Sequence, residues 1–315
     1  MDVKSLAVAI QADIPVLLWG PPGIGKTKTI EALGRALERP VEVLIAATRE
    51  PADIAGYPVP QDGTVGLLPP NWAARSVKGG AILLLDEISC APPAVQAAVL
   101  RLVLDRYAGD YPLPGVAIVG AANPADLAAG GWDLAPAMSN RWCHLQANVD
   151  AIALSAGILA GWPELRVPRL PQNWAERRYE TRALLSAWWR ARPEVVLAPE
   201  DTQRRERAWP SPRTWEMAAI LSAAAQSVSV PDQPLIAGCV GDPAALEFLA
   251  WRQNLDLPDP EELLKNPTRA KLPKRGDQLY AALAAVTAAI LREPTAERYV
   301  AAWDLLERVG REGQA

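Results

Sequence analysis

A glycine-rich octapeptide between a short apolar run and a helical pattern restricts the fold of this chain more than any other feature. Residues 16–19 (VLLW) read as a buried strand, and after the octapeptide apolar side chains recur at helical spacing at Ile30, Leu33 and Leu37. The octapeptide itself, GPPGIGKT, has the G-x-x-x-x-G-K-[ST] spacing of a phosphate-binding loop. Glycine lets the backbone approach a polyphosphate, and a helix N-terminus adds partial positive charge. The spacing therefore predicts a strand–loop–helix unit that binds nucleotide phosphates.

The last residues of the octapeptide carry specific chemistry. The Lys26 ammonium is expected to reach the β and γ phosphates, and the Thr27 hydroxyl to lie on Mg²⁺. The alternative is a glycine-rich turn that binds nothing, but the flanking strand and helix are the context that the motif requires. The predicted nucleotide contacts of this loop are Gly20, Pro21, Pro22, Gly23, Ile24, Gly25, Lys26, Thr27 and Lys28.

Apolar runs alternate with helical patterns through the first half of the chain. Alternation of this kind is typical of a parallel sheet with helices on both faces, so the predicted class is α/β. The helical pattern is clearest over residues 93–107. After the first strand, the predicted strands are Val41–Ala47, Gly80–Leu85, Val116–Ala121 and the weaker Arg141–Leu145.

The second half of the chain shows no strand pattern after about Asp150. Proline-rich joints separate apolar stretches that have helical spacing. We therefore predict an α/β nucleotide-binding domain over residues 1–150 and an all-helical domain over residues 151–315. The helices expected in it are Arg182–Arg192, Arg213–Ser227, Pro243–Trp251, Asp277–Leu291 and Pro294–Val309.

Two further predicted strands end in polar side chains. The run AILLLDEIS ends a strand at Asp86 and Glu87, at the sheet edge where ligands of open α/β folds bind. Asp86 is expected to hold the Mg²⁺ shell, and Glu87 to orient and polarise the attacking water. The run VAIVGAANPADL ends in Asn123, whose amide can donate to the γ-phosphate and accept from the water. The alternatives are a solvated acidic strand end and a turn-forming Asn before Pro124.

Two arginines lie where they could meet phosphate charge. Asn140 and Arg141 precede the fifth strand, after a short helix expected to begin near Asp133. An arginine at this edge could reach the γ-phosphate of a neighbouring subunit, although spacing alone favours a surface residue. Arg213 follows Pro212 in a first helical turn, where a cation gains nothing from the helix dipole. An anionic partner such as ATP, or a salt bridge to a nearby glutamate, would explain it.

The order of these motifs resembles the AAA+ ATPases, and within them the MoxR and dynein-related group. The GPPGIGKT loop is similar to Walker A and LLLDEI to Walker B, while AANP resembles the end of the sensor 1 strand. PAMSNRW resembles the segment carrying the arginine finger, and SPRTW resembles sensor 2. The likeness is specific over residues 10–150 and 209–215, and it is too weak beyond Val228 to carry any role over.

The resemblance implies a ring, usually a hexamer of identical subunits, with ATP and Mg²⁺ bound between subunits and a helical lid behind the nucleotide. It implies that Arg141 acts in trans and Arg213 in cis, and that Arg106 lies at the subunit boundary. It also implies a remodelling ATPase that matures a protein client, with a partner carrying a von Willebrand factor A domain. Arg101 departs from the acid that is frequent at its position in the group.

Composition excludes several other classes. The 315 residues carry a net charge of −4 with no long basic run, which argues against a dedicated nucleic-acid surface but leaves room for a local basic patch. Three scattered cysteines and a single histidine indicate neither a zinc site nor a disulfide scaffold, and fit a reducing compartment. No stretch has the form of a signal peptide or membrane span, so we expect a cytoplasmic protein without a membrane partner.

Two other functions share this core. A nucleic-acid motor or restriction-type GTPase subunit would need a basic pore or an appended DNA-binding domain, and the chain has neither in evident form. The segment expected to form a hairpin, TVGLLPPNWAARSVKGG, holds only Arg75 and Lys78. A nucleotide-gated scaffold that does not hydrolyse ATP would have no need of Glu87, Asn123 and Arg141. ATP hydrolysis is therefore the leading hypothesis.

Overall fold

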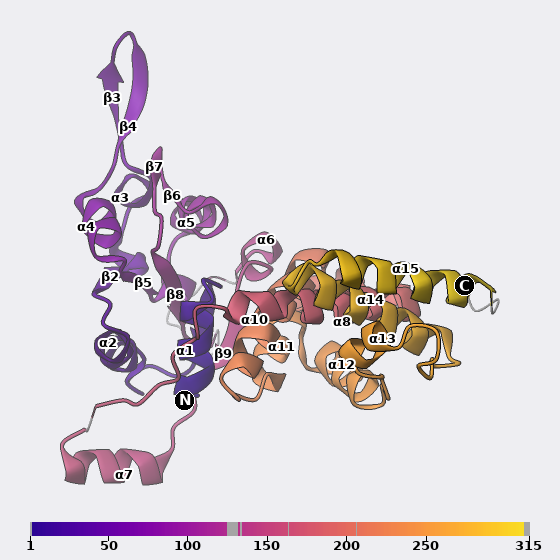
Figure 1. Ribbon diagram of the computed structural model, residues 1–315. Coiled ribbons are helices and arrows are strands. Elements are labelled where there is room, and N and C mark those ends of the chain that lie inside the picture. The colour runs from indigo at the N-terminus through magenta and orange to yellow at the C-terminus, as the bar shows by residue number, and fades with distance from the viewer. Residues whose placement is uncertain (1, 125–131, 133, 163, 206, 312–315) are drawn as a thin grey trace. The chain divides into compact units, whose positions relative to one another are not determined.

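The computed structural model describes residues 2–124, 132, 134–162, 164–205 and 207–311. The chain divides into two compact units (Figure 1). Unit 1 comprises Met1–Leu170 and Gln203–Ala208, and unit 2 comprises Pro171–Thr202 and Trp209–Ala315. The predicted domain boundary lay at residue 150, whereas the helix that follows it groups with unit 1. Asp133, at which a short helix was expected to begin, lies outside the described residues.

A five-stranded parallel sheet forms the centre of unit 1, as the sequence predicted. The strand order is β2-β5-β8-β1-β9, so the strand before the glycine-rich loop lies between β8 and β9. Its central strands are continuous apolar runs because helices cover a parallel sheet on both faces. The strands are β1 (Val16–Trp19), β2 (Val41–Ile45), β5 (Ile82–Asp86), β8 (Ala117–Ala122) and β9 (Cys143–Gln146).

Helices flank this sheet. A buried cluster joins Leu17, Leu83 and Ile118 of the strands to Val95 and Val99 of α5. Helices α1 and α2 contact β8 and β5. The helices of unit 1 are α1 (Val3–Gln11), α2 (Lys26–Leu37), α3 (Pro51–Ala55), α4 (Asn71–Gly79), α5 (Pro93–Asp105), α6 (Pro136–Ser139) and α7 (Ala151–Ala160). The residues of α9 (Glu200–Arg205) are divided between the two units.

Two β-hairpins interrupt the alternation of parallel strands and helices in unit 1. The first pairs β3 (Tyr57–Gln61) with β4 (Thr64–Leu68) and projects from the region of α3 and α4 (Figure 1). The second pairs β6 (Tyr107–Ala108) with β7 (Tyr111–Pro112). The predicted extent of the first hairpin is wrong, because Arg75 and Lys78 lie on α4. The hairpin of residues 57–68 contains neither lysine nor arginine.

Arg39 joins the loops at the amino ends of two strands. Its guanidinium donates to the carbonyl oxygens of Gly80 at 2.6 Å and Ala81 at 3.1 Å, before β5. It also donates to the carbonyl of Gly115, before β8, at 2.5 Å. Arg39 thus ties together the loops that lead into β5 and β8.

Arg106 ends α5 in a left-handed conformation and bonds within unit 1. Its Nη2 donates to the Asp13 carbonyl at 2.8 Å and to the Asp13 carboxylate at 3.0 Å. Burial lowers the pKa of Arg106, and the Asp13 charge partly opposes that shift. A role for this residue at a subunit boundary stays a prediction.

The described residues of unit 2 form helices and connecting loops without a strand, as predicted from the loss of strand patterns after residue 150. The five predicted helices are present as α8, α10, α12, α14 and α15, and two short ones were missed. The helices of unit 2 are α8 (Arg178–Ala191), α10 (Pro212–Ser227), α11 (Gln233–Val240), α12 (Asp242–Gln253), α13 (Pro260–Lys265), α14 (Gly276–Arg292) and α15 (Ala296–Arg311).

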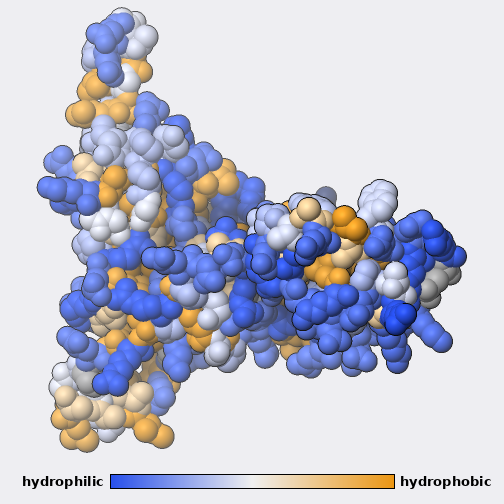
Figure 2. All heavy atoms as spheres, in the orientation of Figure 1, coloured by the Kyte–Doolittle hydropathy of each residue, from blue (hydrophilic) through white to orange (hydrophobic). Residues whose placement is uncertain are grey.

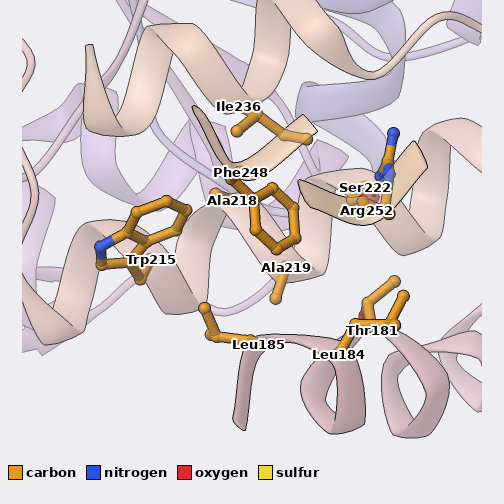
Figure 3. Close-up of a pocket in the computed structure, with 10 residues that line it drawn as sticks. All are labelled: Thr181, Leu184, Leu185, Trp215, Ala218, Ala219, Ser222, Ile236, Phe248 and Arg252. Atoms are coloured by element: carbon orange, nitrogen blue, oxygen red, sulfur yellow. Dashed lines mark hydrogen bonds between the residues drawn. The ribbon is translucent and has the colours of Figure 1, made fainter. Parts of the chain in front are cut away.

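Aromatic side chains fill the core of unit 2 between α8, α10, α11 and α12 (Figure 3). The rings of Trp215 and Phe248 meet edge to face with centroids 5.5 Å apart. The cavity beside them encloses only about 10 Å³, room for about one water. It is a packing defect, too small for a substrate.

An ion pair borders this core. Arg252 donates to Asp232 through Nη1 at 2.6 Å and through Nη2 at 2.9 Å. The Ser222 hydroxyl adds a third bond to the same carboxylate at 2.5 Å. Burial alone would raise the pKa of Asp232, but the bonds from Arg252 and Ser222 outweigh it and hold that pKa below 3.8.

Asp232→Ala is expected to destabilise unit 2 by about 3 kcal/mol, because it leaves a largely buried guanidinium without its partner. Since the folded pKa of Asp232 is lowered, its contribution is complete at neutral pH and is lost as the pH falls through that pKa. Urea unfolding followed by tryptophan fluorescence measures both effects. The exposed Asp304→Ala is the matched control, and an equal midpoint for the two variants would contradict the assignment.

The helix α7 exposes apolar side chains, among them Ile152, Ile158 and Leu159. Figure 2 shows an apolar surface over this helix, at the lower left of the view. Within the described residues, no helix combines the length and the apolar character needed to cross a membrane.

Candidate active site

The glycine-rich loop runs from the end of β1 at Trp19 to the start of α2 at Lys26. Gly23 and Gly25 adopt φ values of 80° and 86°, the left-handed region that favours glycine. At Gly20 a Cβ would lie 2.7 Å from the Ala147 carbonyl oxygen, so a side chain cannot be accommodated. Gly25 caps α2 without a side-chain bond, which leaves the first N–H groups of the helix for a ligand.

Lys26 lies under this loop. Its side chain is buried, and Nζ donates to the Gly20 carbonyl at 2.6 Å and to the Pro21 carbonyl at 3.0 Å. The third bond reaches Asn123 Oδ1 at 2.8 Å. Burial lowers the pKa of Lys26, and the carboxylates of Asp86 and Glu87 partly oppose this shift. The loop thus holds a cation below the helix N-terminus, an arrangement suited to a polyphosphate.

Thr27 and Asp86 meet directly. The Thr27 hydroxyl donates to Asp86 Oδ2 at 2.7 Å, and Asp86 Oδ1 accepts the N–H of Glu87 at 3.0 Å. Asp86 is the last residue of β5, so the strand fixes its direction. A hydroxyl and a carboxylate at this separation are hard oxygen donors of the kind Mg²⁺ prefers. The donor set therefore fits a magnesium ion, and it fits the predicted roles of these two residues.

Glu87 has an unusual backbone for its residue type. Its φ of 56° and ψ of 37° place it in the left-handed region, at the start of the short 3₁₀ turn Ile88–Cys90. Its side chain is exposed. Non-glycine residues held in this region cost about 1–3 kcal/mol and cluster at functional sites. The turn directs Glu87 out of the strand while Asp86 stays in line with it.

Asn123 follows β8 and completes the cluster. Its backbone N–H donates to the Ser89 hydroxyl at 3.1 Å, while its side-chain oxygen accepts from Lys26. Because β5, β8 and β1 are neighbours in the sheet, their carboxyl ends meet. The structure thus brings Lys26, Asp86 and Asn123, predicted from three separate runs, to one edge.

The two predicted arginines are carried by other elements of the chain. Arg141 follows α6 and is half-buried, and its Nη1 donates to the Ala137 carbonyl. Arg213 is exposed in the first turn of α10, in unit 2, and is described within that unit alone. A capping box between Ser211 and Thr214 begins that helix.

Three residues near the site were missed by the sequence reasoning. Ser89 holds the backbone of Asn123, and Trp19 donates its indole N–H to Nδ1 of His144 at 2.8 Å. The single histidine was considered only as a metal ligand. Its place in an apolar strand, with no second histidine to bind a metal, was the available signal for a buried hydrogen-bonding role.

The chain shows partial similarity to curated proteins. It is 33% identical over 134 residues to the Lon protease of Paraburkholderia phytofirmans, and the aligned region covers 37% of this chain and 16% of that protein. It is 40% identical over 79 residues to Lon protease 2 of Borreliella burgdorferi, covering 24% of this chain and 10% of that protein. The chain thus spans less than a fifth of the length of these relatives.

A solved structure of a full-length MCM homologue from Methanopyrus kandleri is 19% identical with a TM-score of 0.44, covering 78% of this chain and 54% of that one. The family model of the AAA domain (dynein-related subfamily) matches residues 15–142. That range contains the glycine-rich loop, the Asp86 strand end and Asn123, and it ends just after Arg141. Over residues 15–142, which carry this site, the chain is similar to the AAA domain of the dynein-related subfamily.

Proposed function

We propose that the protein hydrolyses ATP in the presence of Mg²⁺. The observation that carries this proposal is the hydrogen-bonded edge in which Asn123 bonds Lys26 and Thr27 bonds Asp86. These bonds hold an ammonium, an amide, a hydroxyl and a carboxylate around the start of one helix. A phosphate-binding loop surrounded by these four groups is suited to phosphoryl transfer, in which positioning and charge stabilisation dominate.

Each residue at the edge has a proposed role. The backbone N–H groups after Gly25 bind phosphate oxygens, and Lys26 exchanges its carbonyl partners for the β and γ phosphates. Thr27 and Asp86 hold Mg²⁺, which when bound supplies charge neutralisation to the phosphates. The described residues contain no cluster of three or more His, Cys, Asp or Glu, so the remaining ligands are expected from phosphate and water.

Glu87 is proposed to orient and polarise the attacking water. An exposed carboxylate one residue beyond Asp86 can accept a proton from water that lies against the γ-phosphate. Asn123 donates to the γ-phosphate through its Nδ2 while Oδ1 keeps Lys26 in place. The left-handed backbone of Glu87 separates the two neighbouring carboxylates into a metal ligand and a base.

The proposal includes a second copy of the chain. Arg141 is proposed to act in trans on the γ-phosphate of a neighbouring subunit in a homo-oligomeric, hexameric ring, and Arg213 in cis from the helical unit. The MoxR-type role, remodelling of a protein client beside a von Willebrand factor A partner in the cytoplasm, belongs to this proposal. The absence of lysine and arginine from the hairpin of residues 57–68 supports a protein client over a nucleic acid.

Glu87→Gln is expected to lower ATP turnover by about a hundredfold or more with ATP affinity unchanged, because an amide cannot take a proton from water. The change is close to isosteric and leaves Thr27 and Asp86 intact. Phosphate release and nucleotide titration on the full chain measure the two quantities. Glu297→Gln, the same change at an exposed position of α15, is the control. Equal turnover in Glu87→Gln and the parent would remove Glu87 from the reaction.

A further inference from the structure

A buried tryptophan–histidine pair connects the phosphate loop to the segment that carries Arg141. Trp19 is the last residue of β1, directly before Gly20, and its indole Nε1 donates to Nδ1 of His144 at 2.8 Å. The other ring nitrogen, Nε2, lies 2.9 Å from the carbonyl oxygen of Ser139. Ser139 ends α6, two residues before Arg141. The side chain of His144 thus spans from the loop strand to this segment.

The partners fix the protonation of the ring. An indole N–H can only donate, so Nδ1 of His144 must accept. Nε2 therefore carries the proton and donates to Ser139, and both nitrogens are used. Burial lowers the pKa of His144 to about 4, so the ring is neutral at neutral pH and this arrangement persists.

The three residues of this connection are buried. The exposed fractions are 5% for Trp19, 6% for Ser139 and 9% for His144, so water has little access to replace either bond. The guanidinium of Arg207 covers the indole of Trp19 at 3.8 Å from its ring centroid. Among the described residues, the carbonyl of Ser139 also accepts a longer bond of 3.4 Å from the Trp142 N–H.

We propose that His144 is a positioning residue that sets the place of Arg141 relative to the phosphate loop of its own subunit. The inference rests on the proposed function, in which Arg141 serves the site of a neighbouring copy. Its consequence is specific. In each subunit, the side chain of His144 holds both the phosphate loop and the segment carrying Arg141, which acts on the site of the neighbouring subunit. A purely structural histidine would affect both sites of the subunit alike.

Mixtures of two inactive proteins separate these cases. Arg141→Ala has an intact loop and lacks the finger, and Glu87→Gln offers the finger and cannot hydrolyse ATP. Their mixture is expected to regain activity. His144→Leu is then added to the finger donor in one mixture and to the loop-bearing partner in another, with co-assembly checked for each by size-exclusion chromatography.

His144→Leu in the finger donor is expected to lower the recovered ATPase rate by about tenfold to a hundredfold, since small displacements of catalytic groups have costs of this order. In the loop-bearing partner it is expected to leave the rate within about twofold. His144→Gln in the donor is expected to restore most of the rate, because glutamine offers one acceptor and one donor in place of the ring nitrogens.

Three results would overturn the inference. The first is an undiminished rate with His144→Leu in the donor, and the second is an equal loss on both sides, which indicates a role in the fold or the loop. The third is failure of His144→Gln to restore the rate, which removes the hydrogen bonds from the explanation. Failure of the mixture that carries no His144 change would overturn the two-copy site, and this inference with it.

Discussion

Arg141→Ala is expected to lower ATP turnover by about a thousandfold, because an arginine finger stabilises charge that develops in the transition state. ATP binding to each subunit should survive, since Lys26 and the loop remain. Arg141 directly follows the segment of α6 (Pro136–Ser139), and its Nη1 donates to the Ala137 carbonyl of that helix. Steady-state turnover and nucleotide titration on the full chain measure the loss of turnover and the ATP affinity separately.

The control for this variant is Arg35→Ala. Arg35 is exposed in the last turn of α2, at the opposite end of the helix from the phosphate loop. It should leave turnover unchanged. Turnover of Arg141→Ala within a few-fold of the parent would reduce Arg141 to a surface residue, the alternative that its spacing in the sequence also allows.

Lys26→Ala is expected to raise the Kd for ATP by about a thousandfold, because removing a buried, hydrogen-bonded charge from its partner commonly costs several kcal/mol. Lys26 has three oxygen partners at 2.6, 3.0 and 2.8 Å, so its ammonium is already held at the loop. Isothermal titration with a non-hydrolysable ATP analogue measures the affinity. Lys78→Ala, an exposed lysine of α4, is the control. An unchanged Kd in Lys26→Ala would contradict the phosphate-loop assignment.

Local signals account for the parts of the fold that were predicted. The strand at Val16–Trp19 and the helix that begins at Lys26 follow from an apolar run, glycine punctuation and helical spacing. The hairpin at residues 57–68 was misplaced although it carried a signal. Asp62 and Gly63 both have positive φ, as a two-residue hairpin turn requires, and Asp-Gly is typical of that turn. Prolines at 58 and 60 obscured the strand that precedes it.

For the candidate site too, some contacts could be predicted from the sequence and others could not. Lys26, Asp86 and Asn123 could be placed at one edge because parallel strands end together. The contact between Trp19 and His144 could not be predicted, since it joins side chains 125 positions apart across β1 and β9. The role of Arg213 stays a prediction, because it depends on unit 2 as well as on unit 1.

The central claim is that the chain hydrolyses ATP at a site which a second copy completes, and subunit mixing tests it most directly. Arg141→Ala and Glu87→Gln proteins are combined at varying ratios and constant total concentration, and phosphate release is recorded. The account predicts that neither protein is active alone and that the rate passes through a maximum at intermediate ratios. A rate that stays at the sum of the two separate proteins, in mixtures shown to co-assemble, would contradict it.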